Sequence, residues 1–113
     1  MIKPLLPVLR EKKRYVAFEV LSNRKSSFYE VSKALWNAFS FFIGELELAK
    51  AGIMVIANTF NKDVQKGVIR VNNRYVDHVK AALVFVKAIE QQPVIVRSLI
   101  VSGVLNKALK RVM

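Results

Sequence analysis

The apolar residues of this chain repeat with two different periods, and the order in which the periods follow one another constrains the fold more than any other feature. Over residues 14–21 apolar side chains alternate, so that Val16, Phe18 and Val20 share one face of a half-buried strand. After the polar loop SNRKSS, apolar residues recur at helical spacing from Phe28 onwards. The sequence therefore predicts a strand that is followed by an amphipathic helix.

Both ends of this first helix are marked. Ser27 and Glu30 form a capping box, in which the hydroxyl and the carboxylate each accept a hydrogen bond from a backbone donor at the helix start. Gly44 is a suitable residue to end the helix. We therefore expect a helix over residues 28–43. Its core stripe consists of Phe28, Val31, Leu35, Phe39 and Phe42.

A hairpin is expected after the first helix. Residues 53–60 and 68–71 are predicted strands, and NKDVQKG between them is a polar loop of the hairpin type. Residues 45–51 are a connector to which the pattern assigns no definite structure.

A second helix, a last strand and a short basic helix complete the pattern. Asn72 or Asn73 can cap the second helix, which must end before Pro93. Residues 94–101 are the predicted last strand, and residues 104–111 the final helix. The apolar stripe of the second helix consists of Tyr75, Val79, Ala82, Val86 and Ile89.

This order of elements predicts an α/β (α+β) two-layer sandwich of the ferredoxin-like, RRM-like type. The expected order is β-α-β-β-α-β, with a four-stranded antiparallel sheet in the spatial order 4-1-3-2 and an extra C-terminal helix. Right-handed crossovers place both long helices on one face of the sheet and leave the other face to meet solvent, RNA or protein. Residues 1–13 are expected to be a basic N-terminal arm or a solvated linker, and residues 14–113 a single domain.

The charge balance restricts the possible partners. The chain has 19 Lys and Arg against 8 Asp and Glu, a formal net charge of +11. Such a surface favours a polyanion, with nucleic acid considered first and an anionic membrane second. The absence of cysteine excludes disulfides, thiolate zinc sites and cysteine nucleophiles. The longest apolar region, residues 34–43, falls short of the ~20 residues of a membrane span, so we expect a cytoplasmic protein with no membrane partner.

No set of residues predicts an active site. The single histidine, His78, lies off the apolar stripe and is best explained as an exposed residue. The carboxylates are scattered except for Glu45 and Glu47, and no phosphate-binding glycine loop or metal-ligand spacing occurs. We therefore expect no catalytic residue, metal site or bound cofactor in the protein itself.

Two arginines are expected on the open face of the sheet. Arg70 alternates with core residues, and Arg97 must point outward because burying an uncompensated guanidinium is costly. The same parity turns Leu99 and Val101 outward. The first strand lies between the two arginines, so Glu19 is expected between them. Two interpretations are open: a structural ion triad, or an arginine that contacts phosphate.

Aromatic residues provide weaker signals. Tyr15 is the only candidate for stacking on a base, because the strand VIRVNN carries no aromatic residue. Sequence-specific reading of single strands by stacking is therefore poorly supported. Tyr29, Trp36 and Phe41 do not fit the core stripe of the first helix. They indicate either a wide core face or an apolar surface for a protein partner.

Several stretches, taken in order, are similar to one family. RYVAFEVL after a basic arm, ALWNAF followed by GELELAKA, GVIRVNNRYVDHVKAAL, and RSLIVSG before a basic helix resemble archaeal ribonuclease P protein component 2, the homologue of the eukaryotic POP protein subunit. The likeness extends over about residues 6–111. Val104 departs from the threonine that is usual in this family after the Ser-Gly pair, which leaves open any hydroxyl contact or cap at that position.

The resemblance implies a protein subunit of ribonuclease P, the ribonucleoprotein endonuclease that removes the 5′ leader of precursor tRNA. In that enzyme the RNA carries the chemistry through Mg²⁺, and the protein binds and supports it. The implied partners are ribonuclease P RNA, precursor tRNA indirectly, and ribonuclease P protein component 3, with two such pairs in a heterotetramer. The expected RNA-binding residues are Arg10, Lys12, Lys13, Arg14, Tyr15, Arg70, Arg74, Arg97, Lys107, Lys110 and Arg111. The expected protein interface consists of Tyr29, Trp36 and Phe41.

Two other classes of function compete with this interpretation. The first is a ferredoxin-like interaction or regulatory module without a role in RNA processing, which would not prefer structured RNA over an unrelated duplex. The second is an independent nuclease, which the sparse carboxylates disfavour.

Overall fold

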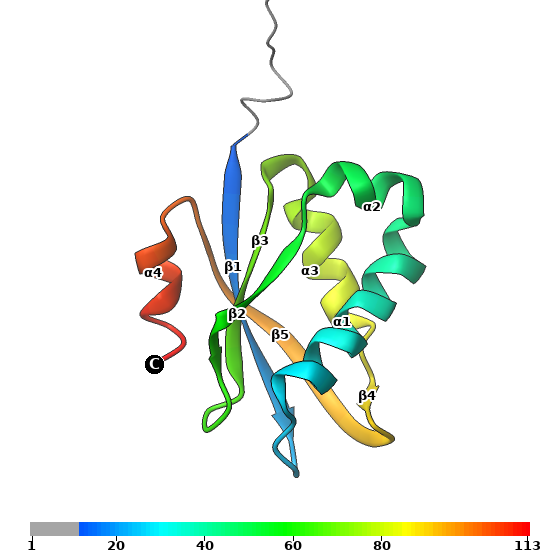
Figure 1. Ribbon diagram of the computed structural model, residues 1–113, viewed down its shortest axis with the longest axis vertical. Coiled ribbons are helices and arrows are strands. Elements are labelled where there is room, and N and C mark those ends of the chain that lie inside the picture. Colours follow the sequence, from blue (N-terminus) through cyan, green and yellow to red (C-terminus); the bar gives the residue numbers. More distant parts are fainter. Residues whose placement is uncertain (1–11) are drawn as a thin grey trace, which may run out of the picture.

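The long strands and helices follow one another in the predicted order, with short elements added between them (Figure 1). The computed structural model describes residues 12–113, so most of the predicted arm at residues 1–13, including Arg10, lies outside the described residues. The elements are β1 (Lys13–Ser22), α1 (Phe28–Ile43), α2 (Glu45–Ala51), β2 (Met54–Asn61), β3 (Lys66–Asn72), the 3-10 turn η2 (Asn73–Tyr75), α3 (Val76–Val84), β4 (Ala88–Ile89), β5 (Gln92–Ser102) and α4 (Leu105–Leu109).

The strands form one antiparallel sheet in the order β2-β3-β1-β5-β4. The four long strands, β2, β3, β1 and β5, have the predicted spatial order, with β5 as the predicted fourth strand. The prediction of a four-stranded sheet was wrong, because β4 adds a short fifth strand at the edge. β4 and β5 are joined by a tight turn at Glu90 and Gln91, whose φ values are 50° and 67°. Positive φ at both central residues is typical of a type I′ turn, where Asn and Gly are usual. Positions 90 and 91 carry neither Asn nor Gly, so the turn could not be predicted from the sequence.

The face of the sheet that carries α1 and α3, here called the inner face, holds the main core. Val16, Phe18 and Val20 of β1 are buried there, as their alternation predicts. The helices contribute buried residues from their apolar stripes. These are Val31, Leu35 and Phe39 of α1 and Val79, Ala82 and Leu83 of α3. Two residues of the predicted α1 stripe lie at the margin of this core, since Phe28 is half-buried and Phe42 is 38% exposed.

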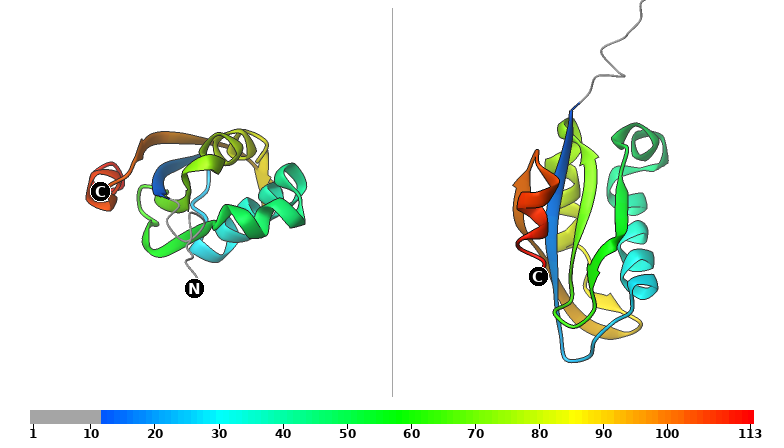
Figure 2. Two further views of the ribbon diagram at one scale, coloured as in Figure 1. Left: turned by 90° about the horizontal axis from the view of Figure 1, so that it is seen from above. Right: turned by 60° about the vertical axis from the view of Figure 1, so that its left-hand side comes forward.

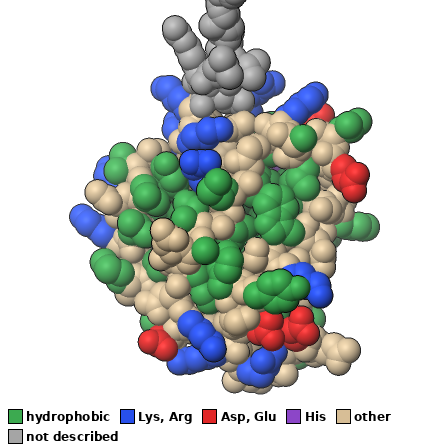
Figure 3. Space-filling model, in the orientation of Figure 1, with side chains coloured by type: hydrophobic (Ala, Val, Ile, Leu, Met, Phe, Trp, Pro, Cys, Tyr) green, Lys and Arg blue, Asp and Glu red, His purple; other side chains and the backbone are tan. Residues whose placement is uncertain are grey.

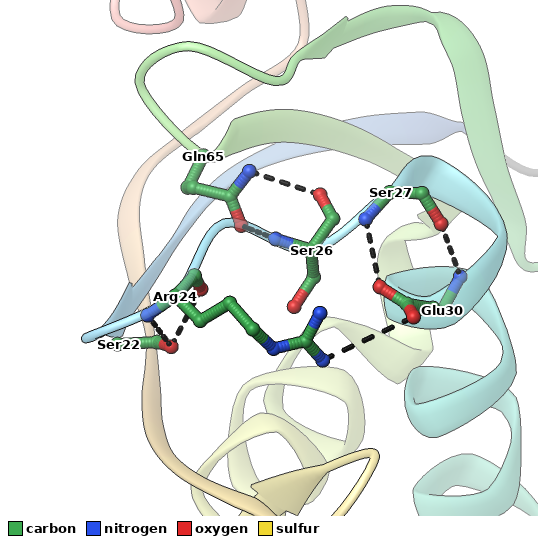
Figure 4. A network of polar contacts seen from close by, with 6 residues as sticks. All are labelled: Ser22, Arg24, Ser26, Ser27, Glu30 and Gln65. Atoms are coloured by element: carbon green, nitrogen blue, oxygen red, sulfur yellow. Dashed lines mark hydrogen bonds and ion pairs between the residues drawn. The ribbon is translucent and has the colours of Figure 1, made fainter.

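α1 has the predicted bounds because its capping box forms. The backbone N–H of Ser27 donates to Glu30 Oε1 (3.0 Å), and the N–H of Glu30 donates to Ser27 Oγ (3.2 Å), as Figure 4 shows. The helix ends before Gly44, whose φ is 90°. The following residues, predicted as a connector, form the short helix α2 instead.

The loop that leads into α1 is fastened to the β2–β3 turn by a buried glutamine (Figure 4). The side chain of Gln65 accepts a hydrogen bond from the Ser26 N–H (2.9 Å) and donates to the carbonyl oxygens of Ser26 (3.0 Å) and Lys62 (2.7 Å). The Gln65 carbonyl also accepts from the N–H of Val20 (2.8 Å). These bonds hold the start of α1 against the hairpin.

The second long helix is shorter than predicted. α3 begins after η2, and Asn72 and Asn73 do not cap it, because its N-terminal neighbour is Tyr75 and no side-chain capping bond is present. Asn72 is buried and uses its side chain elsewhere, accepting from Lys13 Nζ and donating to the Lys50 carbonyl oxygen (2.8 Å). The helix ends at Val84, so the last residue of the predicted stripe belongs to β4.

A β-bulge changes the parity of β5. Ala17 of β1 lies opposite Ile100 and Phe18 lies opposite Ser98, which leaves Leu99 as the extra residue. Beyond the bulge Ile100 packs on the outer face, opposite the helices α1 and α3, and Val101 packs against the inner core. The predicted outward orientation of Val101 and inward orientation of Ile100 were therefore wrong. Leu99 points outward, as predicted.

The outer face is partly covered instead of open. α4 lies on the opposite side of the sheet from α1 (Figure 2), and its Ala108, with Val112 just beyond it, packs against Ala17 and Val68. All four side chains are buried, and they form a second, smaller core. Within residues 12–113, no helix is long and apolar enough to cross a membrane.

Candidate nucleic-acid interface

The two predicted outward arginines lie on either side of β1 and have different surroundings. Arg97 of β5 is opposite Glu19 of β1. Its Nε donates to Glu19 Oε1 at 2.9 Å, and its Nη2 lies 2.9 Å from the same oxygen. The Arg97 side chain is 58% exposed and that of Glu19 only 15%. The expected pairing of Glu19 with Arg97 is thus confirmed.

Arg70 does not complete an ion triad. In the antiparallel register Arg70 is opposite Tyr15 of β1 and Met54 of β2, whereas Lys66 is opposite Glu19. Four residues along a strand separate two positions by roughly 13 Å. Glu19 is therefore out of reach of Arg70, and the prediction that it lies between two arginines was wrong.

The Arg70 side chain is without a polar partner among the described residues. No hydrogen bond or ion pair joins it to residues 12–113, and its Nε is a buried donor with no acceptor. Tyr15 beside it is half-buried and packs against the outer cluster under α4. The outer face thus presents one neutralised arginine and one with unused donors.

Further cations gather where β1 begins. Lys12 is exposed, and the N–H of Asn73 in η2 donates to its carbonyl oxygen (2.8 Å), which places the exposed Arg74 at the same end of the sheet. Arg14 is half-buried and its Nη1 donates to the carbonyl oxygen of Lys13 (3.1 Å). On the face seen in Figure 3, Lys and Arg side chains gather at this end and at the opposite end, with hydrophobic side chains between them.

Gly103 brings the exit of β5 close to the start of β1. A Cβ at this position would lie 3.1 Å from Arg14 Nη1, a tight approach to the end of a flexible side chain. Ser102 Oγ accepts a hydrogen bond from the Val104 N–H (3.0 Å) and fixes the turn into α4. Val104 makes no side-chain capping bond, and the turn relies on Ser102. The exposed cations of this region are Lys107, Lys110 and Arg111.

The aromatic residues of α1 do not form a single surface. Tyr29 is 71% and Phe41 84% exposed, whereas Trp36 is half-buried and packs edge-on against Phe39, with ring centroids 5.8 Å apart. Trp36 lines a hollow with residues of α2, and Phe41 borders a groove between α1 and the α3–β4 segment.

Two further exposed aromatics, Phe85 at this groove and Phe42 next to Phe85, were not expected from the sequence. Phe85 is 52% exposed and its ring lies 4.8 Å from that of Phe42. The sequence assigned Phe42 to the core stripe and no role to Phe85. Phe85 directly follows the last residue of α3 and keeps a helical backbone conformation.

The titratable groups do not assemble an active site. The Tyr75 hydroxyl donates to Glu47 Oε1 (2.6 Å), and this bond, together with Lys50, lowers the pKa of the Glu47 carboxyl. His78 is exposed and packs its ring 5.2 Å from that of Tyr75. Among residues 12–113, no three His, Asp or Glu side chains lie close enough together to hold a metal ion.

Comparison with known proteins gives consistent results. The sequence model of the Rpp14/Pop5 family matches residues 14–113. Ribonuclease P protein component 2 of Pyrococcus furiosus is 40% identical to this chain over 109 residues, which cover 96% of the chain and 88% of the relative. The protein of the same name from Methanocaldococcus jannaschii is 34% identical over 108 residues, which cover 96% of the chain and 78% of the relative.

A solved structure shares the fold. A chain in the cryo-EM structure of yeast ribonuclease MRP superposes with a TM-score of 0.65 and 16% sequence identity, over 91% of this chain and 79% of that one. The likeness extends over nearly all the elements described above.

Proposed function

The chain belongs to the Rpp14/Pop5 family, and on that premise we propose that it is a protein subunit of ribonuclease P. In this role it binds and supports the catalytic RNA that removes the 5′ leader of precursor tRNA. Its proposed contribution to the endonuclease is structural and electrostatic; its described residues hold no group of three or more side chains that could bind a metal ion. The Mg²⁺ that the reaction requires is held by the RNA.

The observation that carries this proposal is the placement of cations without acidic partners. Lys107, Lys110 and Arg111 are exposed beside α4 and make no ion pair with any residue of the described chain. Arg70 is likewise unpaired on the same outer face. Unpaired cations on one surface are what phosphate binding requires.

We assign the RNA contacts to two groups of residues. The first lies at the start of β1 and in η2, and the second on the outer face and α4. Arg97 is left out of both groups because its guanidinium already binds Glu19. The proposed RNA-binding residues are Lys12, Lys13, Arg14, Tyr15, Arg70, Arg74, Lys107, Lys110 and Arg111.

Ribonuclease P protein component 3 is the proposed protein partner, in an assembly of two pairs. Its proposed contact is α1, which presents the exposed side chains of Tyr29 and Phe41. Trp36 lines a neighbouring hollow, so addition of the partner should reduce quenching of Trp36 fluorescence by a soluble quencher. Unchanged quenching in a verified complex would exclude this placement.

Salt dependence of binding tests the RNA-binding role. Replacing Lys12, Lys13, Lys110 and Arg111 with Gln should flatten the slope of log K against log salt by roughly three to four units, since each phosphate contact contributes about 0.7 to 0.9. A control variant replaces four exposed lysines elsewhere with Gln and so removes the same charge. Its slope of log K against log salt should stay within one unit of the wild-type slope. Its positions are Lys33, Lys62, Lys80 and Lys87. Equal slopes for the two variants would refute the assignment.

A further inference from the structure

We infer that Tyr15 and Arg70 form a binding site for one unpaired nucleotide of an RNA. The inference rests on the proposed RNA-binding function and specifies the kind of RNA segment that the outer face takes. It concerns a single base and its phosphate, not a duplex.

The two side chains lie next to one another on the sheet. Tyr15 and Arg70 are directly opposite in the antiparallel β1–β3 ladder and both point to the outer face. Side chains opposite one another on such a ladder have Cβ atoms about 4.5–5.5 Å apart. An aromatic ring and a guanidinium are thus fixed side by side on rigid strands.

Arg70 has hydrogen-bonding capacity that no described residue meets. Its Nε is buried without an acceptor, which costs free energy until an acceptor arrives. Glu19 is the only carboxylate on the strands β1, β2 and β3, and it is bound to Arg97. No described residue supplies an acceptor to Arg70 Nε, and a phosphate or base oxygen could serve as one once the side chain turns outward.

The surroundings of Tyr15 limit the size of the ligand. On the side toward the middle of the sheet, Ala17 and Val68 are covered by Ala108 and Val112, so no second base can stack there. β3 has no aromatic residue that could hold another base. Tyr15 is consequently a platform for a single base.

An aromatic ring beside a guanidinium suits unpaired RNA better than a duplex. Bases inside a duplex stack on their neighbours and do not offer a face to a protein ring, whereas unpaired bases do. Stacking on one tyrosine tolerates every base. The site therefore selects for an unpaired nucleotide without selecting its identity, and the α4 cations lie on the same side of the sheet for the flanking phosphates.

Binding of two RNA probes to the full chain tests the inference. The probes are a short single-stranded polyuridine and a blunt duplex of equal length, and the variants are Tyr15→Leu, Tyr15→Phe and Arg70→Gln, with Arg97→Gln as the matched control. Thermal unfolding verifies that each variant is folded. Tyr15→Leu should weaken single-strand binding roughly 5- to 150-fold, the change that corresponds to about 1–3 kcal/mol per stacked base. Tyr15→Phe and Arg97→Gln should bind within about twofold of the wild type, and duplex binding by Tyr15→Leu should change by less than about twofold.

The outcomes separate this inference from the proposed function. Arg70→Gln should weaken single-strand binding more than Arg97→Gln does. Cross-linking of 5-iodouridine in the single-stranded probe should map to Tyr15 in the wild-type chain, a readout that does not depend on the stability of any variant. If Tyr15→Leu loses affinity for both probes equally, or the cross-link maps elsewhere, the nucleotide site is refuted while RNA binding stands. If the wild-type chain binds neither probe nor ribonuclease P RNA, the proposed function fails and the inference with it.

Discussion

The two faces of the sheet differ in what covers them. The inner face is covered by α1 and α3 and holds the larger apolar core, whereas the outer face has a small cluster under α4 beside charged and unpaired groups. Ala82 and Ala108 illustrate the contrast, since both are fully buried, Ala82 on α3 in the inner core and Ala108 on α4 in the outer cluster. The difference indicates that the inner face determines stability and that the outer face is available for binding.

The largest effect should come from placing a charge at these two alanines. Ala82→Asp buries a carboxylate in a core that cannot open locally, and we expect it to lower the free energy of unfolding by more than about 4 kcal/mol. Ala108→Asp should cost only about 1–3 kcal/mol, because α4 can swing away about Gly103 without opening the sheet. Urea denaturation measures both values. Equal losses would show that α4 is as integral to the fold as α3.

A second pair of substitutions, at two phenylalanines of α1, sharpens the comparison between a buried and an exposed surface. Phe39 is fully buried on the inner face, and Phe41 on the same helix is 84% exposed. Phe39→Ala should cost about 3–5 kcal/mol, as large-to-small substitutions of buried aromatics do. Phe41→Ala should change stability by no more than about 0.5 kcal/mol and instead weaken binding of the protein partner. Comparable destabilisation by both variants in urea denaturation would contradict the assignment of Phe41 to an interface.

On the outer face the ion pair of Arg97 should contribute little to stability. The Arg97 side chain is more than half exposed, and exposed pairs are worth about 0.2–1 kcal/mol. Glu19→Gln should therefore lower the free energy of unfolding by no more than about 1 kcal/mol and leave RNA affinity within about twofold. A large loss of RNA affinity with Glu19→Gln would mean that this ion pair, and not Arg70, organises the RNA surface.

The smallest effect is expected from Glu47. The hydrogen bond from Tyr75 lowers the pKa of this carboxyl in the folded chain, so its stabilising contribution is present above its unfolded value of 4.5 and is lost as pH falls through the folded value. The stability difference between wild type and Glu47→Gln should accordingly be constant near neutral pH and shrink under acid conditions. Chemical denaturation at a series of pH values checks this, and a difference that grows with acidity would contradict it.

Sequence patterns were sufficient to predict those features that depend on residues close together in the chain. Ser27 and Glu30 specify the start of α1 through bonds between residues three apart, and the alternation of Val16, Phe18 and Val20 identifies the inner face of β1. The pairing of Glu19 with Arg97 also followed from parity and the cost of burying a charge.

The predictions that were wrong concern features that depend on pairing between segments far apart in the sequence. The bulge at Leu99 reverses the parity of β5 after Arg97, and only the register with β1 shows it. The same applies to Arg70, whose neighbour Tyr15 is set by the β1–β3 register. Alternation within one strand says which face a residue occupies, but it does not say which residue lies opposite. The unpaired donor of Arg70 was therefore visible only in the structure.

Reconstitution of precursor tRNA cleavage tests the central claim most directly. Ribonuclease P RNA is assayed at limiting Mg²⁺ with component 3 present, with and without the full chain, and the chain is assayed alone. The account predicts that adding the chain raises the rate of 5′ leader removal, that no cleavage occurs without the RNA, and that the variant with Gln at Lys12, Lys13, Lys110 and Arg111 restores less activity than its charge-matched control. Equal rates with and without the chain, or cleavage by the chain alone, would contradict it.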